Sequence, residues 1–244
     1  MVRTLLIRGM LVGLLAGVLA LIFAEIFGEP QVNRAIAVED AIAQAAGEAP
    51  EPELISREVQ STVGLATAML VYSAAFGGLF ALAFAYANGR VGSLSPRAVA
   101  ALVAGAIFVV VFLVPALKYP PNPPSVGNPD TITYRTELFF FMILVSLAAL
   151  ALAVSIARPL IARFGTWNGV LVAAAVFILV IIAAQILLPT IDEVPSAFPA
   201  SSLWRFRIAS LGIQVVIWAT IGLVFGALTE RSLSPRRVGR LTAS

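Results

Sequence analysis

The sequence contains no cysteine and no histidine among its 244 residues. Without cysteine the chain cannot form a disulfide or a thiolate metal site, and without histidine it has no imidazole ligand. The same absences exclude every nucleophile of the Ser-His or Cys-His type. Its one lysine, Lys118, is followed by Tyr119, so there is no phosphate-binding P-loop, which needs a Lys-Ser or Lys-Thr pair. No polar stretch is long enough for an ATPase domain, so any transport would draw its energy from a gradient or a partner.

Charged residues are also scarce. They make up 12% of the chain, whereas hydrophobic residues make up 60% and the mean hydropathy is +0.97. This composition lies outside the range of soluble domains and predicts an all-α integral membrane protein with the lipid bilayer as its main partner. The net charge of +3 gives no reason to expect nucleic acid, because its distribution follows the membrane topology.

Six apolar segments are each long enough to cross a bilayer, which takes about 20 helical residues. We predict transmembrane helices at residues 5–27, 62–87, 98–117, 138–157, 169–188 and 208–228. The first follows Arg3 and Arg8 as a signal peptide would, but its apolar run exceeds the usual length of about 7–15 residues. Its glycines at every fourth position predict close packing against another helix. Ser95 and Pro96 mark the start of the third helix, and Asn33 a separate surface helix.

The charges predict the orientation of these helices. Twelve of the thirteen acidic residues lie in or beside the loops at 28–61, 118–137 and 189–207, and the exception is Glu230. Ten of the sixteen basic residues lie at the N-terminus or on the opposite side of the helices. Because short cytoplasmic loops carry an excess of Lys and Arg, we predict three hairpins with both termini in the cytoplasm. The three acidic loops then face outward.

The loop at 118–137 is rich in proline and is predicted to be the centre of the functional face. Five of its residues between positions 120 and 129 are proline, which excludes a helix there. Asp130 or Thr131 can cap the helix that follows, and Asp130 is favoured. Irregular backbone at a membrane boundary must rest on protein or line a water-filled cavity. We therefore predict that this loop is ordered and lies beside a vestibule open to the exterior.

Charged residues on this outer face form the candidate site. Arg135, Arg205 and Arg207 lie at predicted helix starts, where the helix dipole disfavours a cation unless an anion compensates it. We predict structural ion pairs for these arginines together with Lys118 and Asp130, although lipid phosphate could also serve as the anion. Carboxylates and an amide on the same face could form a hard, all-oxygen site for a divalent cation. These candidate metal ligands are Glu25, Glu137, Asp192, Glu193 and Asn122.

Several long segments of the chain are distinctive: GEPQVNRAI, REVQSTVGL, FLVPALKYPPNPPSVGNPDTI, YRTE and DEVPSAFPASSLWRFRIASLG. Together they resemble the CbtA family of predicted cobalt transporter subunits. The resemblance implies a multi-pass protein of the bacterial inner membrane that takes part in cobalt uptake linked to cobalamin synthesis. It also implies a small single-span partner of the CbtB type with a histidine-bearing segment. The family is described with five spans, whereas the sequence predicts six, and no family metal ligands can be carried over.

Three kinds of function stay open at this point. The chain could be a transport subunit for a divalent metal such as cobalt, with the outer carboxylates where the metal enters. It could instead be a non-catalytic scaffold that binds a small subunit carrying the metal ligands. An intramembrane enzyme would have to rely on carboxylates, one lysine and hydroxyl groups, so we expect no enzyme and no cofactor.

Overall fold

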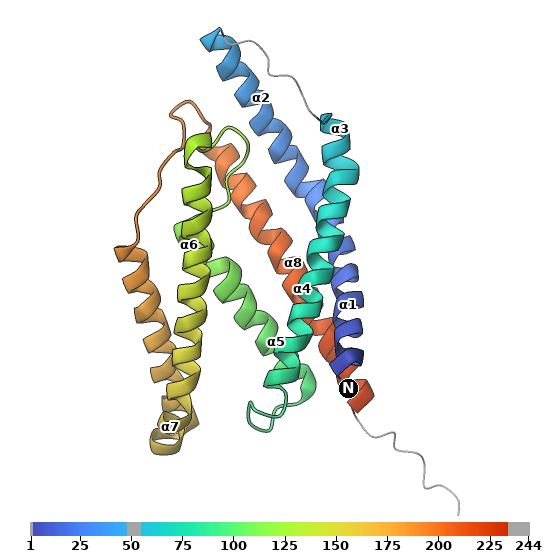
Figure 1. Ribbon diagram of the computed structural model, residues 1–244, viewed down its shortest axis with the longest axis vertical. Coiled ribbons are helices and arrows are strands. Elements are labelled where there is room, and N and C mark those ends of the chain that lie inside the picture. Colours follow the sequence, from blue (N-terminus) through green and yellow to red (C-terminus); the bar gives the residue numbers. More distant parts are fainter. Residues whose placement is uncertain (1, 48–54, 234–244) are drawn as a thin grey trace, which may run out of the picture. The chain divides into compact units, whose positions relative to one another are not determined.

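The computed structural model describes residues 2–47 and 55–233, and that part of the chain contains helices and loops but no strand. Five helical stretches are long and apolar enough to cross a membrane (Figure 1). They are Val2–Ala45, Arg57–Ala87, Pro96–Lys118, Pro129–Leu187 and Ala200–Leu233. Large apolar side chains stay exposed along them, including Leu144 at 63% and Ile186 at 76%. Such surfaces are favourable in lipid and costly in water, which fits the predicted all-helical, multi-pass membrane protein.

Three of these stretches contain a π-helical segment. The first joins α1 (Val2–Phe23), η1 (Ala24–Gly28) and α2 (Glu29–Ala46). The second joins α3 (Arg57–Val59), η2 (Gln60–Gly64) and α4 (Leu65–Ala87). The third joins α5 (Pro96–Ile107), η3 (Phe108–Leu113) and α6 (Val114–Lys118). The remaining elements are the 3₁₀ turn η4 (Pro129–Thr131), α7 (Ile132–Leu187) and α8 (Ala200–Leu233). Each π segment widens the helix and frees backbone groups for other partners.

Element α7 spans 56 residues and comprises two helices joined across a kink at Gly165. Gly165 has φ 79° and ψ 164°, a conformation outside any helix. Figure 1 shows the helix doubling back at this point into two arms. Residues from both arms, Met142 and Ile181, lie in one buried cluster. The predicted segments 138–157 and 169–188 fall on the two arms, which explains how six apolar segments correspond to five helices.

The start of α5 is as predicted, and the start of α2 is not. The backbone N–H of Ala98 donates to Ser95 Oγ at 3.3 Å, so Ser95 caps a helix that begins at Pro96. The prediction that Asn33 caps a separate surface helix is wrong. Helix α2 begins at Glu29 and continues from α1 through η1, so Asn33 lies inside it. Pro30 lies in the first turn of α2, directly after η1, so its missing backbone N–H falls where the hydrogen-bond pattern changes from π-helical to α-helical.

The chain forms two compact units, which we describe separately. Unit 1 comprises residues 2–22, 57–106 and 215–233. In it, α1 and α4 meet along small residues, and a Cβ added at Gly77 would lie 2.1 Å from the carbonyl oxygen of Gly9. The predicted packing face of the first helix is therefore confirmed. Phe225 of α8 packs edge-on against Phe80 and Phe84 at centroid distances of 5.1 Å.

Unit 2 comprises residues 23–47, 55–56 and 107–214 and contains the loops at 119–128 and 188–199, which the charge distribution predicts to face outward. Its larger buried cluster includes Val114 of α6 together with Met142 and Ile181 of α7. The buried Ser146 hydroxyl of α7 donates to the Val110 carbonyl in η3. A second cluster joins Ala35 of α2, Val126 of the proline-rich loop and Phe198 of the following loop. The proline-rich loop is thus packed against protein.

Candidate functional site

The proline-rich loop begins with two side chains that fasten α6 to the end of α7. Lys118 Nζ donates to the Gln185 carbonyl oxygen at 2.7 Å and to Thr190 Oγ1 at 3.1 Å. A cation is favourable there because the last carbonyl groups of a helix carry partial negative charge. The Tyr119 hydroxyl donates to the Pro189 carbonyl oxygen at 2.9 Å. Burial, with a smaller effect of Tyr134, raises the pKa of Tyr119, so its hydroxyl remains a neutral donor.

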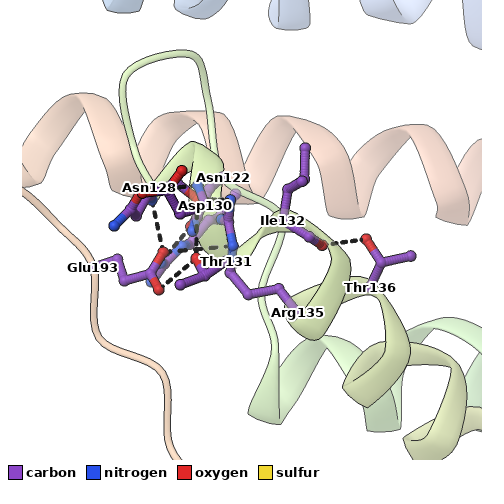
Figure 2. Close-up of polar contacts among 9 residues, drawn as sticks. Asn122, Asn128, Asp130, Thr131, Ile132, Arg135, Thr136 and Glu193 are labelled. Carbon is purple, nitrogen blue, oxygen red and sulfur yellow. Dashed lines mark hydrogen bonds and ion pairs between the residues drawn. The ribbon is translucent and has the colours of Figure 1, made fainter.

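Glu193 ties the second loop to the proline-rich loop (Figure 2). Its carboxylate accepts from the Asn128 backbone N–H at 2.7 Å and from Thr131 Oγ1 at 2.7 Å. Arg135 Nε lies 3.5 Å from Glu193 Oε2. The hydrogen bond from Asn128 and then that from Thr131 lower the pKa of the Glu193 carboxyl, burial opposes them with a smaller effect, and the Arg135 charge lowers the pKa by the smallest amount. We call Glu193, Asn128, Thr131 and Arg135 the outer clamp.

Gly127 makes room for the outer clamp. Its φ of 120° lies in the region that side chains rarely adopt, and an added Cβ would lie 2.1 Å from Arg135 Nη1. The Arg135 guanidinium therefore rests directly on the loop backbone, and its Nη2 donates to the Asn128 carbonyl oxygen at 3.2 Å. A side chain at position 127 would displace the arginine from Glu193.

Asn128 caps the 3₁₀ turn η4, and Thr131 occupies the N-cap position of α7 without a side-chain capping hydrogen bond. The prediction that favoured Asp130 as the cap is wrong. Asn128 Oδ1 accepts from the Asp130 backbone N–H at 2.9 Å, and Pro129 follows in the first position of η4. An Asn before a proline at a helix start is a common capping arrangement, so the sequence did contain the signal. Asp130 is exposed and, within the described residues, its carboxylate makes no ion pair.

Arg207 of α8 reaches the same loop through Asn122. Its Nη2 donates to Asn122 Oδ1 at 2.8 Å. Its Nε is buried and, in the described part of the chain, has no hydrogen-bond partner. Asp192 is the carboxylate that acts on it electrostatically, although the two side chains form no ion pair within the residues that the structure describes. Arg207 is therefore held by an amide and keeps most of its donors unused.

These residues surround a cavity of about 740 Å³ that we call the outer cavity. Three cationic side chains line it, from Lys118, Arg135 and Arg207, and two carboxylates, from Asp192 and Glu193. The rest of the wall is largely apolar. It includes Phe112, Leu117, Tyr119, Ile132, Phe139, Ile191 and Val194. The polar groups thus gather at one part of a mostly apolar pocket, an arrangement typical of small-molecule sites.

The structure brings together only some of the predicted site residues. Asp192, Glu193 and Asn122 line the outer cavity with Arg135 and Arg207. Glu25 in η1 and Glu137 in α7 are exposed and do not line it. Arg205 is exposed and borders a separate pocket of about 240 Å³. The described residues contain no group of three or more His, Cys, Asp or Glu side chains that could hold a metal ion.

Sequence reasoning missed three contacts of the site, although it named Thr131 as a possible helix cap. Thr131 and Asn128 bind Glu193, and Thr190 binds Lys118. Each of these contacts joins residues more than sixty positions apart, so local sequence patterns contain no record of the pairing. Only the capping role of Asn128 had a local signal, in the Asn-Pro pair.

Comparison with known proteins gives one family. The family model described as "Probable cobalt transporter subunit (CbtA)" matches residues 2–230, nearly the whole chain. The searches of curated proteins and of solved structures returned no match.

Proposed function

The chain belongs to the CbtA family of probable cobalt transporter subunits, and we propose that it is a membrane subunit of a cobalt uptake system in a bacterial inner membrane. The outer cavity is the site where the metal substrate first reaches the protein. The observation that carries this proposal is the cavity itself: about 740 Å³ of space, bordered by Asp192 and held by the outer clamp.

The proposed topology has six crossings and both termini in the cytoplasm. The break at Gly165 supports two crossings by α7, because 56 helical residues would extend about 84 Å, far more than the bilayer core of about 30 Å. The excess of arginine at the N-terminus and on the side of the helices opposite the acidic loops supports the orientation. In this arrangement the loops that line the outer cavity face the exterior.

A second candidate function is supported by the shortage of free metal ligands. Glu193 accepts from the outer clamp and Asn122 accepts from Arg207. Asp192 is then the one cavity carboxylate with no hydrogen bond or ion pair to the described residues. Divalent cations bound by oxygen take about six ligands or more. The chain could therefore act as a scaffold for a small single-span subunit, of the CbtB type, that supplies the remaining ligands.

We propose no catalytic step and no resident cofactor for this chain. The site contains neither a nucleophile paired with a base nor, among the described residues, a cluster of metal-binding side chains. Its groups are arranged to hold loops and to present charge to a cavity. A transport or scaffold role requires no more than this.

Cobalt uptake distinguishes the two candidate functions. Cells that express this chain alone, the small subunit alone, or both would be compared for accumulation of cobalt. Uptake by the chain alone, reduced by Asp192→Asn but not by Glu137→Gln, would support direct transport. Uptake only with both chains, and unaffected by Asp192→Asn, would support the scaffold. Absence of uptake in all three strains at normal protein levels would contradict both.

A further inference from the structure

The outer cavity has one more cationic than anionic side chain, so a metal would enter it more favourably with an anionic ligand than as a bare cation. Three cationic side chains and two carboxylates line it, and one of the carboxylates, Glu193, is already bound by three donors. A divalent cation placed there would face Lys118, Arg135 and Arg207 with Asp192 as its main compensation. The unused capacity of the cavity lies in hydrogen-bond donors, not in acceptors.

Arg207 contributes most of these unused donors. A guanidinium has five N–H donors and no acceptor, and within the described residues Arg207 makes one hydrogen bond, to the neutral amide of Asn122. Its Nε is buried without a hydrogen-bond partner in the described part of the chain, whereas the Nε of Arg135 is already ion-paired with Glu193 at 3.5 Å. Buried donors of this kind are costly when unpaired. Asn122 fixes the orientation of Arg207 without neutralising its charge.

We propose that the outer cavity binds a small organic oxyanion, whose carboxylate or phosphate group is held by the guanidinium of Arg207 with support from Arg135. Arginine matches such groups because its planar fork can donate two parallel hydrogen bonds to them. The volume of about 740 Å³ exceeds that of an inorganic ion and is typical of a pocket for a small molecule. The apolar wall of Phe112, Phe139 and Ile191 would accommodate the carbon part of the ligand.

This inference goes beyond cobalt uptake and does not depend on it. An oxyanion in the cavity could be a soluble carboxylate, including one that carries a metal, or the phosphate of a lipid headgroup. Both sources offer the same chemistry to Arg207. The experiment below separates them, and its readout is binding, so a failure of cobalt uptake leaves it unaffected.

The test measures ligand binding to the full-length purified protein in a neutral detergent. Citrate and inorganic phosphate would be titrated calorimetrically at constant ionic strength, with chloride as the reference anion. Short-chain phosphatidylglycerol would then be used to compete with citrate. We expect saturable binding of at least one of these oxyanions. Displacement of citrate by low concentrations of the lipid would identify a headgroup as the natural source, and persistent citrate binding would identify a soluble carboxylate.

Two variants and one control locate the site. Arg207→Gln removes the charge and should weaken binding about ten- to hundredfold, the loss of one or two charged hydrogen bonds. Arg205→Gln removes an equal charge on the same helix but outside the outer cavity, and should leave the affinity unchanged. Thr136→Phe leaves all charges in place and narrows the cavity, because Thr136 lines it and its hydroxyl donates to the Ile132 carbonyl of its own helix. It should also weaken binding, and it keeps the test informative if Arg207→Gln does not fold.

The proposal is overturned by either of two results. One is no saturable binding of citrate, phosphate or the short-chain lipid above the chloride reference. The other is equal affinity of Thr136→Phe, Arg207→Gln and Arg205→Gln for the oxyanion. That result would mean an adventitious ion only.

Discussion

At the scale of single residues, two neighbouring carboxylates, Asp192 and Glu193, differ in what they contact. Glu193 is committed to the outer clamp by two hydrogen bonds at 2.7 Å and the Arg135 charge. Asp192, next to it, is exposed and lines the outer cavity. Two adjacent carboxylates thus have different surroundings, and what distinguishes Glu193 from Asp192 is its contacts with the proline-rich loop.

The lowered pKa of Glu193 predicts how stability depends on pH. Because the folded-state pKa lies below the unfolded value, the contribution of Glu193 is present above the unfolded pKa of about 4.3 and is lost as pH falls through the folded value. Glu193→Gln should lower the midpoint of thermal unfolding at pH 7. The difference from wild type should shrink as the pH is lowered below about 4.

Glu137→Gln is the control, because Glu137 is exposed and lies outside the outer clamp. This variant should leave the midpoint of thermal unfolding unchanged at pH 7 and below about pH 4. The midpoints of wild type, Glu193→Gln and Glu137→Gln are measured in detergent by intrinsic fluorescence at several pH values. An equal midpoint for Glu193→Gln and wild type at pH 7 would contradict the role of the outer clamp.

At the scale of elements, the contact of α1 with α4 depends on the lack of side chains at its centre. Gly77→Ala would place a Cβ 2.1 Å from the Gly9 carbonyl oxygen, an atom of the neighbouring backbone. The helices would have to separate, and overpacking of this kind costs about 1–3 kcal/mol. We expect a lower midpoint of thermal unfolding.

Gly105→Ala provides a matched control in the same unit. Gly105 is also helical, and a Cβ there would have no neighbour within 4 Å. Alanine is favoured over glycine in a helix by about 0.5–1 kcal/mol, so this variant should be as stable as wild type or slightly more stable. A midpoint for Gly77→Ala that equals that of Gly105→Ala would show that the helices can adjust freely.

The proline-rich loop is predicted to resist proteolysis although it lies outside any long helix. Val126 is buried at 6% exposure, Pro123 is buried, and the loop carries one side of the outer clamp. Residues 89–95, by contrast, are exposed throughout. Limited digestion of the detergent-solubilised protein by a protease of low specificity should cut 89–95 well before 120–129. Mass spectrometry of the fragments gives the order, and earlier cleavage at 120–129 would contradict the packing.

The sequence predicted some elements of the fold well and others not at all. Hydropathy predicted the apolar helices, and the Ser95-Pro96 pair predicted where α5 begins, because both signals are local. The continuation of α1 into α2 was missed, because Gly28 and Pro30 predict the end of a helix whereas η1 and the start of α2 continue the helix through them. The partners of Glu193 and Lys118 lie in distant loops. Their pairing depends on how α7 folds back, which no local pattern records.

At the scale of the whole molecule, the number of crossings decides which side of the membrane the chain ends on. An N-terminus in the cytoplasm and five crossings would place Ser244 outside, whereas six crossings place it inside. Counting α7 once gives five and counting its two arms gives six, so the break at Gly165 is the feature on which the topology depends. The arginines support six, because Arg158 and Arg163 lie just before the break, where the positive-inside rule expects cytoplasm.

Reporter fusions test this topology directly. A reporter that is active only outside the cytoplasm should be silent when fused after Gly165 or after Ser244, and active when fused after Ala197, in the loop between α7 and α8. Activity after Ser244 together with silence after Gly165 would mean that α8 does not cross. Activity at Gly165 would mean that the break faces outward and that the orientation is reversed. In that case the outer cavity would open to the cytoplasm, and both the proposed entrance for cobalt and the proposed oxyanion site would have to be assigned to the opposite side of the membrane.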